Sequence, residues 1–113
     1  MIEVTILNYL NSQSLSARVY TEIPKEMPSK FFVIEKTGSS MDDHIPRSTF
    51  AVKSYAPSMY EAASMNEEIK AEMLDGLITL GDIARVELNS DYNFTDTATK
   101  TYRYQAVFDI THY

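Results

Sequence analysis

The chain has 113 residues, of which 44% are hydrophobic and 23% are charged, so we expect one folded domain over residues 1–113. The formal charge is −6 and the ten basic residues form no run. This argues against tight binding to nucleic acid, because affinity for phosphate comes chiefly from clustered lysine and arginine. The absence of cysteine excludes disulfides, thiolate metal ligands and a cysteine nucleophile.

The N-terminal residues lack the basic start and long apolar core of a signal peptide. No apolar run approaches the roughly 18–20 residues that are needed to span a bilayer. We therefore expect a soluble protein that is made in a cytoplasm and has no membrane partner.

Hydrophobic periodicity predicts the first elements. Residues 2–10 have apolar side chains at a helical spacing, which indicates a short helix. Residues 19–23 form a short extended segment that ends at a proline. Residues 30–36 contain the compact apolar run FFVI, which is typical of a strand that is buried on both faces.

Residues 37–47, with the sequence TGSSMDDHIPR, are rich in turn-forming residues and predict a polar loop. Residues 48–55 then alternate, with Phe50 and Val52 on one face of a strand. We expect this strand to pair with the preceding one as a hairpin with an unusually long loop.

A capping box predicts the start of the main helix, because Ser58 is a good N-cap and glutamate follows three residues later. The helix should run from Met59 to Leu77 or Leu80, where Gly81 ends it. Asn66 falls near the edge of the apolar stripe and is expected to face away from the core. Met65 lies off the stripe and is a candidate for a contact surface.

The last part of the chain predicts two more strands. Residues 83–88 alternate with Ala84, Val86 and Leu88 inward, residues 89–99 form a polar turn, and residues 101–112 form a long strand. The order is therefore α-β-β-β-α-β-β. This order predicts an α+β domain with an antiparallel or mixed sheet of four to five strands, one long helix and one short helix.

Asp42-Asp43-His44 is the one local cluster with the donors that a metal ion needs, but adjacent residues rarely converge on one ion without further ligands. Gly38-Ser39-Ser40 lacks the lysine and the other glycines of a phosphate-binding loop. No serine lies in a nucleophile elbow. We therefore predict no catalytic, cofactor-binding or metal-binding residue, and expect that the protein is not an enzyme.

Four stretches carry a resemblance to a known family: IPKEMPSKFFVIEKTGSS, STFAVKSYAPS, YEAASMNEEIKAEML and YRYQAVFDITHY. Taken in this order, they resemble the tail-completion proteins of long-tailed bacteriophages, which are tail terminators or tail-to-head joining proteins. The resemblance covers residues 18–112. Ser39 stands where the family often has a second glycine. The residues that match the family's pattern are Ile23-Pro24, Pro28, Phe32-Val33, Gly38, Ala62-Ala63 and Arg103-Tyr104.

The resemblance implies a structural virion protein that assembles as a ring, typically of six copies, at the head-proximal end of the tail tube. There it would end tail growth and join the tail to the head. Its implied partners are further copies of itself, the major tail tube protein and a head-connector or head-completion protein. Six copies would carry −36 formal charges, six times −6, so DNA could pass through an acidic lumen without binding.

Two groups of residues are candidate contact sites within this reading. We expect the 37–47 loop to project from the sheet toward the lumen, the tube or a neighbouring copy. We also expect aromatic residues in the 89–99 turn to help form a subunit contact, because aromatics are frequent interface hot spots. These aromatics could equally tuck onto their own core. The candidates are Ser39, Ser40, Met41, Asp42, Asp43, His44, Tyr92 and Phe94.

Two other readings stay open from the sequence. The chain could be a small ligand-binding or regulatory α+β domain that acts as a dimer, which would need an apolar pocket with converging polar groups. It could also be an enzyme if the fold brought His44 together with carboxylates.

Overall fold

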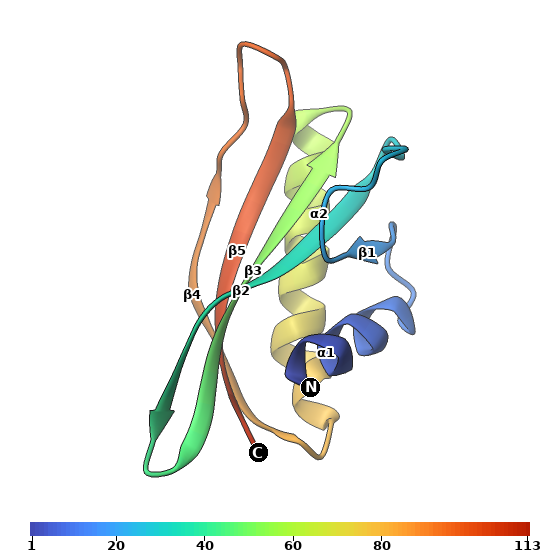
Figure 1. The fold of residues 1–113 in the computed structure, drawn as a ribbon. Helices are drawn as coiled ribbons and strands as arrows, with labels where there is room; N and C mark the ends of the chain where they lie inside the picture. Colours follow the sequence, from blue (N-terminus) through green and yellow to red (C-terminus); the bar gives the residue numbers. More distant parts are fainter.

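The structure is a computed structural model that describes the backbone of residues 1–113 and every side chain except that of Asp42. Over these residues the chain forms a five-stranded mixed sheet with both helices on one face (Figure 1), which confirms the predicted α+β class and element order. The strands are ordered β1-β2-β3-β5-β4, and β1 runs parallel to β2. The elements are α1 (Ile2–Asn11), β1 (Val19–Tyr20), β2 (Phe31–Asp42), β3 (Ile45–Ala56), α2 (Met59–Ala71), β4 (Ile83–Asn93) and β5 (Tyr102–His112).

The main core lies between the helices and the sheet. Its centre is a pair of phenylalanines, Phe50 and Phe108, which are directly opposite on β3 and β5 and are almost fully buried. The FFVI strand is buried on both faces, as the sequence predicts. Phe32 joins the helix-side core, whereas Phe31 and Val33 belong to a smaller cluster on the other face of the sheet. We call this other face the open face, because neither helix covers it (Figure 1).

The predicted cap of α2 is confirmed. The hydroxyl of Ser58 accepts a hydrogen bond from the backbone N–H of Glu61 at 3.2 Å and donates to the Glu61 carboxylate at 3.0 Å. Helical backbone continues beyond α2 as a π-helical turn (Glu72–Gly76) and a 3-10 turn (Leu77–Thr79), so the predicted end near Leu80 also holds. No helix in the described chain is long and apolar enough to cross a membrane.

The π-helical turn packs against α1 through a tyrosine. The hydroxyl of Tyr9 donates to a carboxylate oxygen of Glu72 at 2.7 Å, and burial, followed by Glu72, raises the pKa of Tyr9 to about 12. Gly76 lies directly beside this pair. A Cβ atom at Gly76 would overlap the Tyr9 hydroxyl and the Glu72 carboxylate.

We therefore expect Gly76→Ala to lower the free energy of unfolding by about 1–3 kcal/mol, because the extra methyl group overpacks this contact. Urea denaturation measures the change. Gly81→Ala is the matched control, because a Cβ atom there meets nothing within 4 Å. In a Tyr9→Phe background the cost of Gly76→Ala should shrink, since the hydroxyl is gone and Glu72 can swing away. An equal cost in both backgrounds would contradict this account.

Two predictions about α2 are wrong. Met65 and Asn66 are both 2% exposed, so neither faces solvent. Asn66 is buried because its side-chain amide donates to the carboxylate of Asp91 on β4 at 3.1 Å. The same carboxylate oxygen accepts from Lys70 at 2.6 Å, and Lys70 also forms an ion pair with Glu67 at 2.7 Å.

The hydrogen bonds that Asn66 and Lys70 donate to Asp91 make the stability of the fold depend on pH. The hydrogen bond from Lys70, foremost, holds the pKa of Asp91 below its ordinary value, against the opposing effect of burial. A carboxyl whose pKa is lower in the folded chain contributes stability above the pKa of the unfolded chain, and that stability is lost as the pH falls through the folded pKa. We expect Asp91→Asn to lower stability at neutral pH by less than about 1 kcal/mol and to flatten the acid dependence below about pH 4. Urea titrations between neutral and acid pH measure both, and an unchanged slope would contradict the prediction.

The alternation predicted for residues 83–88 holds only in part. Val86 packs on the core, but Ala84 is exposed and Ile83 is buried in its place. The register of β4 shifts between Ile83 and Arg85, and this bulge moves the inward positions by one residue. Leu88 lies opposite Phe108 but stays 39% exposed, because β4 is the edge strand of the sheet.

Candidate functional site

Residues 37–47 do not form a loop, which corrects the prediction. They are the outer halves of β2 and β3, which stay paired until Asp42 lies opposite Ile45. The register of this ladder shifts between Lys36 and Gly38, which places a β-bulge at Thr37. Thr37 is one of the polar residues from which a loop was predicted. The ladder pairs the backbone groups of β2 and β3 that face one another, and the polar side chains of these residues suit strands that water surrounds.

We call residues 38–49 the hairpin arm. It extends beyond the helix layer, at the lower left of Figure 1. Its turn consists of Asp43 and His44 alone, with φ angles of 49° and 66°. Two-residue hairpin turns of the type that matches strand twist need such positive φ values, which aspartate and histidine tolerate better than most residues.

The structure places five of the six candidate residues of this region on the surface of the arm. Ser39 and Ser40 lie opposite Ser48 and Arg47, and the backbone of Asp42 ends β2, while the Asp42 side chain lies outside the described residues. The far end of the arm is also apolar. Met41 is 65% exposed and Ile45 is 38% exposed. The exposed candidates are Ser39, Ser40, Met41, Asp43 and His44.

The other end of the open face carries a row of aromatic side chains that is interrupted by one arginine. The rings of Phe31 and Tyr55 are directly opposite on β2 and β3 and stack at 4.6 Å. Arg103 follows opposite Tyr55 on β5. We call this set the aromatic row, and it crosses the whole sheet. Its members, from β1 to β4, are Tyr20, Phe31, Tyr55, Arg103, Phe94 and Tyr92.

The candidates Tyr92 and Phe94 lie together in this row. Their rings meet edge to face at 6.2 Å, and the Arg103 guanidinium covers Phe94 at 4.4 Å from the ring centroid. Arg103 also donates to the backbone carbonyl of Phe94 at 3.0 Å. Tyr92 belongs to β4 and not to a turn, because β4 extends to Asn93, which corrects the predicted 89–99 turn. Phe94 is half-buried, and Tyr92 remains 46% exposed.

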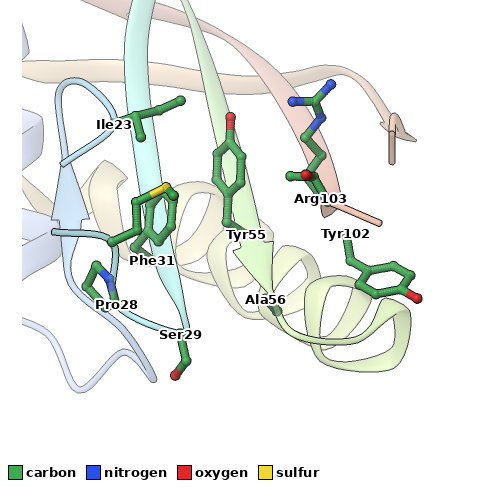
Figure 2. Close-up of a pocket in the computed structure, with 10 residues that line it drawn as sticks. Ile23, Pro28, Ser29, Phe31, Tyr55, Ala56, Tyr102 and Arg103 are labelled. Atoms are coloured by element: carbon green, nitrogen blue, oxygen red, sulfur yellow. The ribbon is translucent and has the colours of Figure 1, made fainter. Parts of the chain in front are cut away.

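A groove of about 410 Å³ lies over the β2–β3–β5 part of the row. Figure 2 shows Tyr55 rising between Ile23 on one side and Arg103 on the other. The segment that leads from β1 to β2 forms the outer rim, where Ile23 is 54% exposed and Met27 is 65% exposed. Arg103 is the one charged residue in the lining that the structure describes. The complete lining is Ile23, Met27, Pro28, Ser29, Phe31, Tyr55, Ala56, Thr101, Tyr102 and Arg103.

Sequence reasoning missed this groove. Its residues come from three separate stretches of the chain, and only strand register brings Phe31, Tyr55 and Arg103 to one level. One signal was present, since Ile23 and Met27 are apolar residues in a segment framed by prolines. The structure does not bring the hairpin arm and the aromatic row together, because they lie at opposite ends of β3.

Two arrangements with catalytic or ligand chemistry do not form a site. The Ser48 hydroxyl lies 2.9 Å from Nε2 of His112, as in a nucleophile and base pair, but Ser48 is 2% exposed and a substrate could not reach it. Among the side chains that the structure describes, which leave out Asp42, no three histidine, aspartate or glutamate residues lie in an arrangement that could hold a metal ion.

Charge is distributed unevenly between the two faces. From Ser58 to Asp82, which includes α2, six acidic residues and one lysine give a formal charge of −5. The open face is nearly balanced, because basic Arg47, Arg85 and Lys53 sit beside acidic Glu35, Glu87 and Asp109 in ion pairs of 3.0–4.0 Å. The helix layer therefore carries most of the net charge of the chain.

Comparison of the chain with models of protein families and with curated protein sequences finds no match to either.

Proposed function

We propose that this protein is a structural component of a bacteriophage or prophage virion. Copies of the chain form a ring on the head-proximal end of the tail tube, end tail growth, and join the tail to the head. The proposal begins from the ordered sequence resemblance over residues 18–112. The hairpin arm is the structural observation that supports it best.

Three features of the arm would favour contact with another chain. Its strands extend past the helices, so neither helix covers its outer half (Figure 1). β1 pairs with β2 only at Phe32 and Val33, so the outer edge of β2 from Glu35 to Asp42 has no partner strand in the described chain. Exposed Met41 and Ile45 at the far end would favour burial against a partner.

The acidic helix layer suits a protein past which DNA must move. A surface with a formal charge of −5 around α2 repels phosphate and opposes binding. The open face is nearly neutral and carries the aromatic row, which suits contacts between proteins, where tyrosine, phenylalanine and arginine are enriched. The acidic helix layer would then face the passing DNA, and the open face would form the contacts between proteins.

Electron microscopy of particles from the phage or prophage that carries this gene tests the proposal. Deleting the gene should leave filled heads separated from tails of uncontrolled length, and supplying the intact gene in trans should restore complete virions. Normal virions without the gene would exclude the proposed role.

The groove supports a second candidate function, a small-molecule binding domain. Its volume of about 410 Å³ lies within the range of ligand pockets, and Tyr55 and Arg103 supply polar groups around an apolar floor (Figure 2). A screen of small aromatic carboxylates by NMR tests this function. Saturable shifts at Tyr55 and Arg103 would support it, and no saturable shift across the screen would count against it.

A further inference from the structure

The hairpin arm and the groove are two dissimilar surfaces at opposite ends of one strand. β3 begins at Ile45 beside the turn and ends at Tyr55 and Ala56 in the groove. At a rise of about 3.3 Å per residue, these ends lie roughly 35 Å apart. The arm and the groove therefore lie at opposite ends of one paired strand in a molecule that is 45 Å long, and the arm of a chain cannot reach its own groove.

The two surfaces are complementary in polarity and in charge. The tip of the arm, residues 41–46, carries exposed Asp43 and exposed, apolar Met41 and Ile45, and the last two project from opposite faces because they lie on adjacent rungs. Asp42 and Asp43 are the only charged residues between Lys36 and Arg47, so the tip is acidic. The groove has an apolar floor and Arg103 as its one charged lining residue among those described. Arg103 forms no ion pair with a described carboxylate. Its guanidinium can therefore pair with a carboxylate of another chain.

We propose that the tip of one copy inserts into the groove of the next copy, with Ile45 against the apolar floor, Met41 on the opposite face of the arm against the apolar rim, and Asp43 beside Arg103. The biological role of this contact rests on the proposed ring function. The contact is heterologous, since each copy offers its tip to one neighbour and its groove to another. Repeated with a constant rotation, such a contact closes into a ring or continues as a filament.

The cysteine-free chain allows a direct test by disulfide trapping, which captures weak and transient contacts. His44→Cys places a thiol on the tip and Ser29→Cys places one on the rim of the groove. Tyr60→Cys, on the 82% exposed Tyr60 of α2, serves as the control position. One variant of each mixed pair carries a tag, so that the heterodimer is resolved from either homodimer.

We expect the tip–groove pair to form heterodimer several-fold faster than the tip–control pair. The rate should fall as salt is added, since Asp43 and Arg103 attract one another. A chain that carries both His44→Cys and Ser29→Cys should give a ladder of covalent oligomers. Equal rates for the two pairs would overturn the contact, and a ladder that stops at the dimer would overturn its head-to-tail arrangement.

Surface variants give a second test, in which the thiols at the tip and the groove stay in place and the apolar contact is changed. Met27→Glu on the rim and Met41→Glu on the tip replace side chains that are each 65% exposed, so the fold should be unaffected. Either variant should reduce the cross-linking rate of the tip–groove pair to that of the tip–control pair. Val4→Glu on α1 should not change the rate of the tip–groove pair. A rate that withstands both variants would overturn the contact.

The outcome is separable from that of the proposed function. Trapping uses the purified full chain and needs no virion. If the contact forms but deletion of the gene leaves virions intact, only the tail role is refuted. Separated heads and tails after deletion, together with equal trapping rates, would refute only the contact.

Discussion

A chain whose hairpin arm is shortened by two rungs is expected to fold like the intact chain and to leave phage heads separated from tails. The deletion removes Met41-Asp42 and Ile45-Pro46, which are two opposite pairs, and keeps the Asp43-His44 turn. Ser40 and Arg47 then flank the turn. Because equal numbers are removed from each strand, every remaining side chain keeps its face of the sheet.

Stability should change by less than about 1 kcal/mol, because Met41 and Ile45 are exposed and Pro46 is only half-buried. Circular dichroism and urea denaturation of the purified variant measure this. Electron microscopy of particles made with the shortened gene measures the assembly defect. Val4→Glu, a change at an exposed residue of α1 outside the arm, is the control that should give complete virions. Complete virions from the shortened gene would contradict a role for the arm.

Phe108→Ala should have the largest effect on stability, a loss of about 3–5 kcal/mol in the free energy of unfolding. Phe108 is fully buried in the main core and lies opposite Phe50 on the central strand β3. Truncation removes most of a large apolar side chain and leaves a cavity that the sheet cannot close, since strand pairing holds both neighbours in place. The loss is large against the 5–15 kcal/mol that stabilises a typical domain.

Urea denaturation with fluorescence detection measures the effect of Phe108→Ala. Tyr92→Ala is the matched control, because it also removes an aromatic ring from this part of the sheet but from a side chain that is 46% exposed. We expect the control to lose about 1 kcal/mol or less. Similar losses for the two variants would contradict the placement of the core on the helix side of the sheet.

Local patterns in the sequence were enough to predict the order and class of the elements. The cap of α2 depends on Ser58 and Glu61, which are three residues apart, and the inward faces of β3 and β5 follow from strict alternation. The FFVI run indicated a strand buried on both faces because no polar residue interrupts it. Each of these features is decided by neighbours in the chain, so sequence periodicity captures them.

The errors in prediction arose where distant residues decide the conformation. Gly38 and the adjacent serines favour turns by themselves, but pairing with residues 47–49 holds them in a strand. Asn66 is polar and would face water in an isolated helix, but Asp91 on β4 supplies a buried partner. The bulge after Ile83 moves Ala84 outward. In each case a hydrogen bond or register shift that spans many residues outweighs local propensity.

The sequence by itself therefore determined the acidic charge, the absence of cysteine, the element order and the helix cap. Only the tertiary structure decided that Phe31, Tyr55 and Arg103 share one level of the sheet, and that the arm and the groove lie at opposite ends of β3. The physical reason is that strand register joins residues from separate stretches of the chain. Local composition does not encode which of these residues will lie opposite one another.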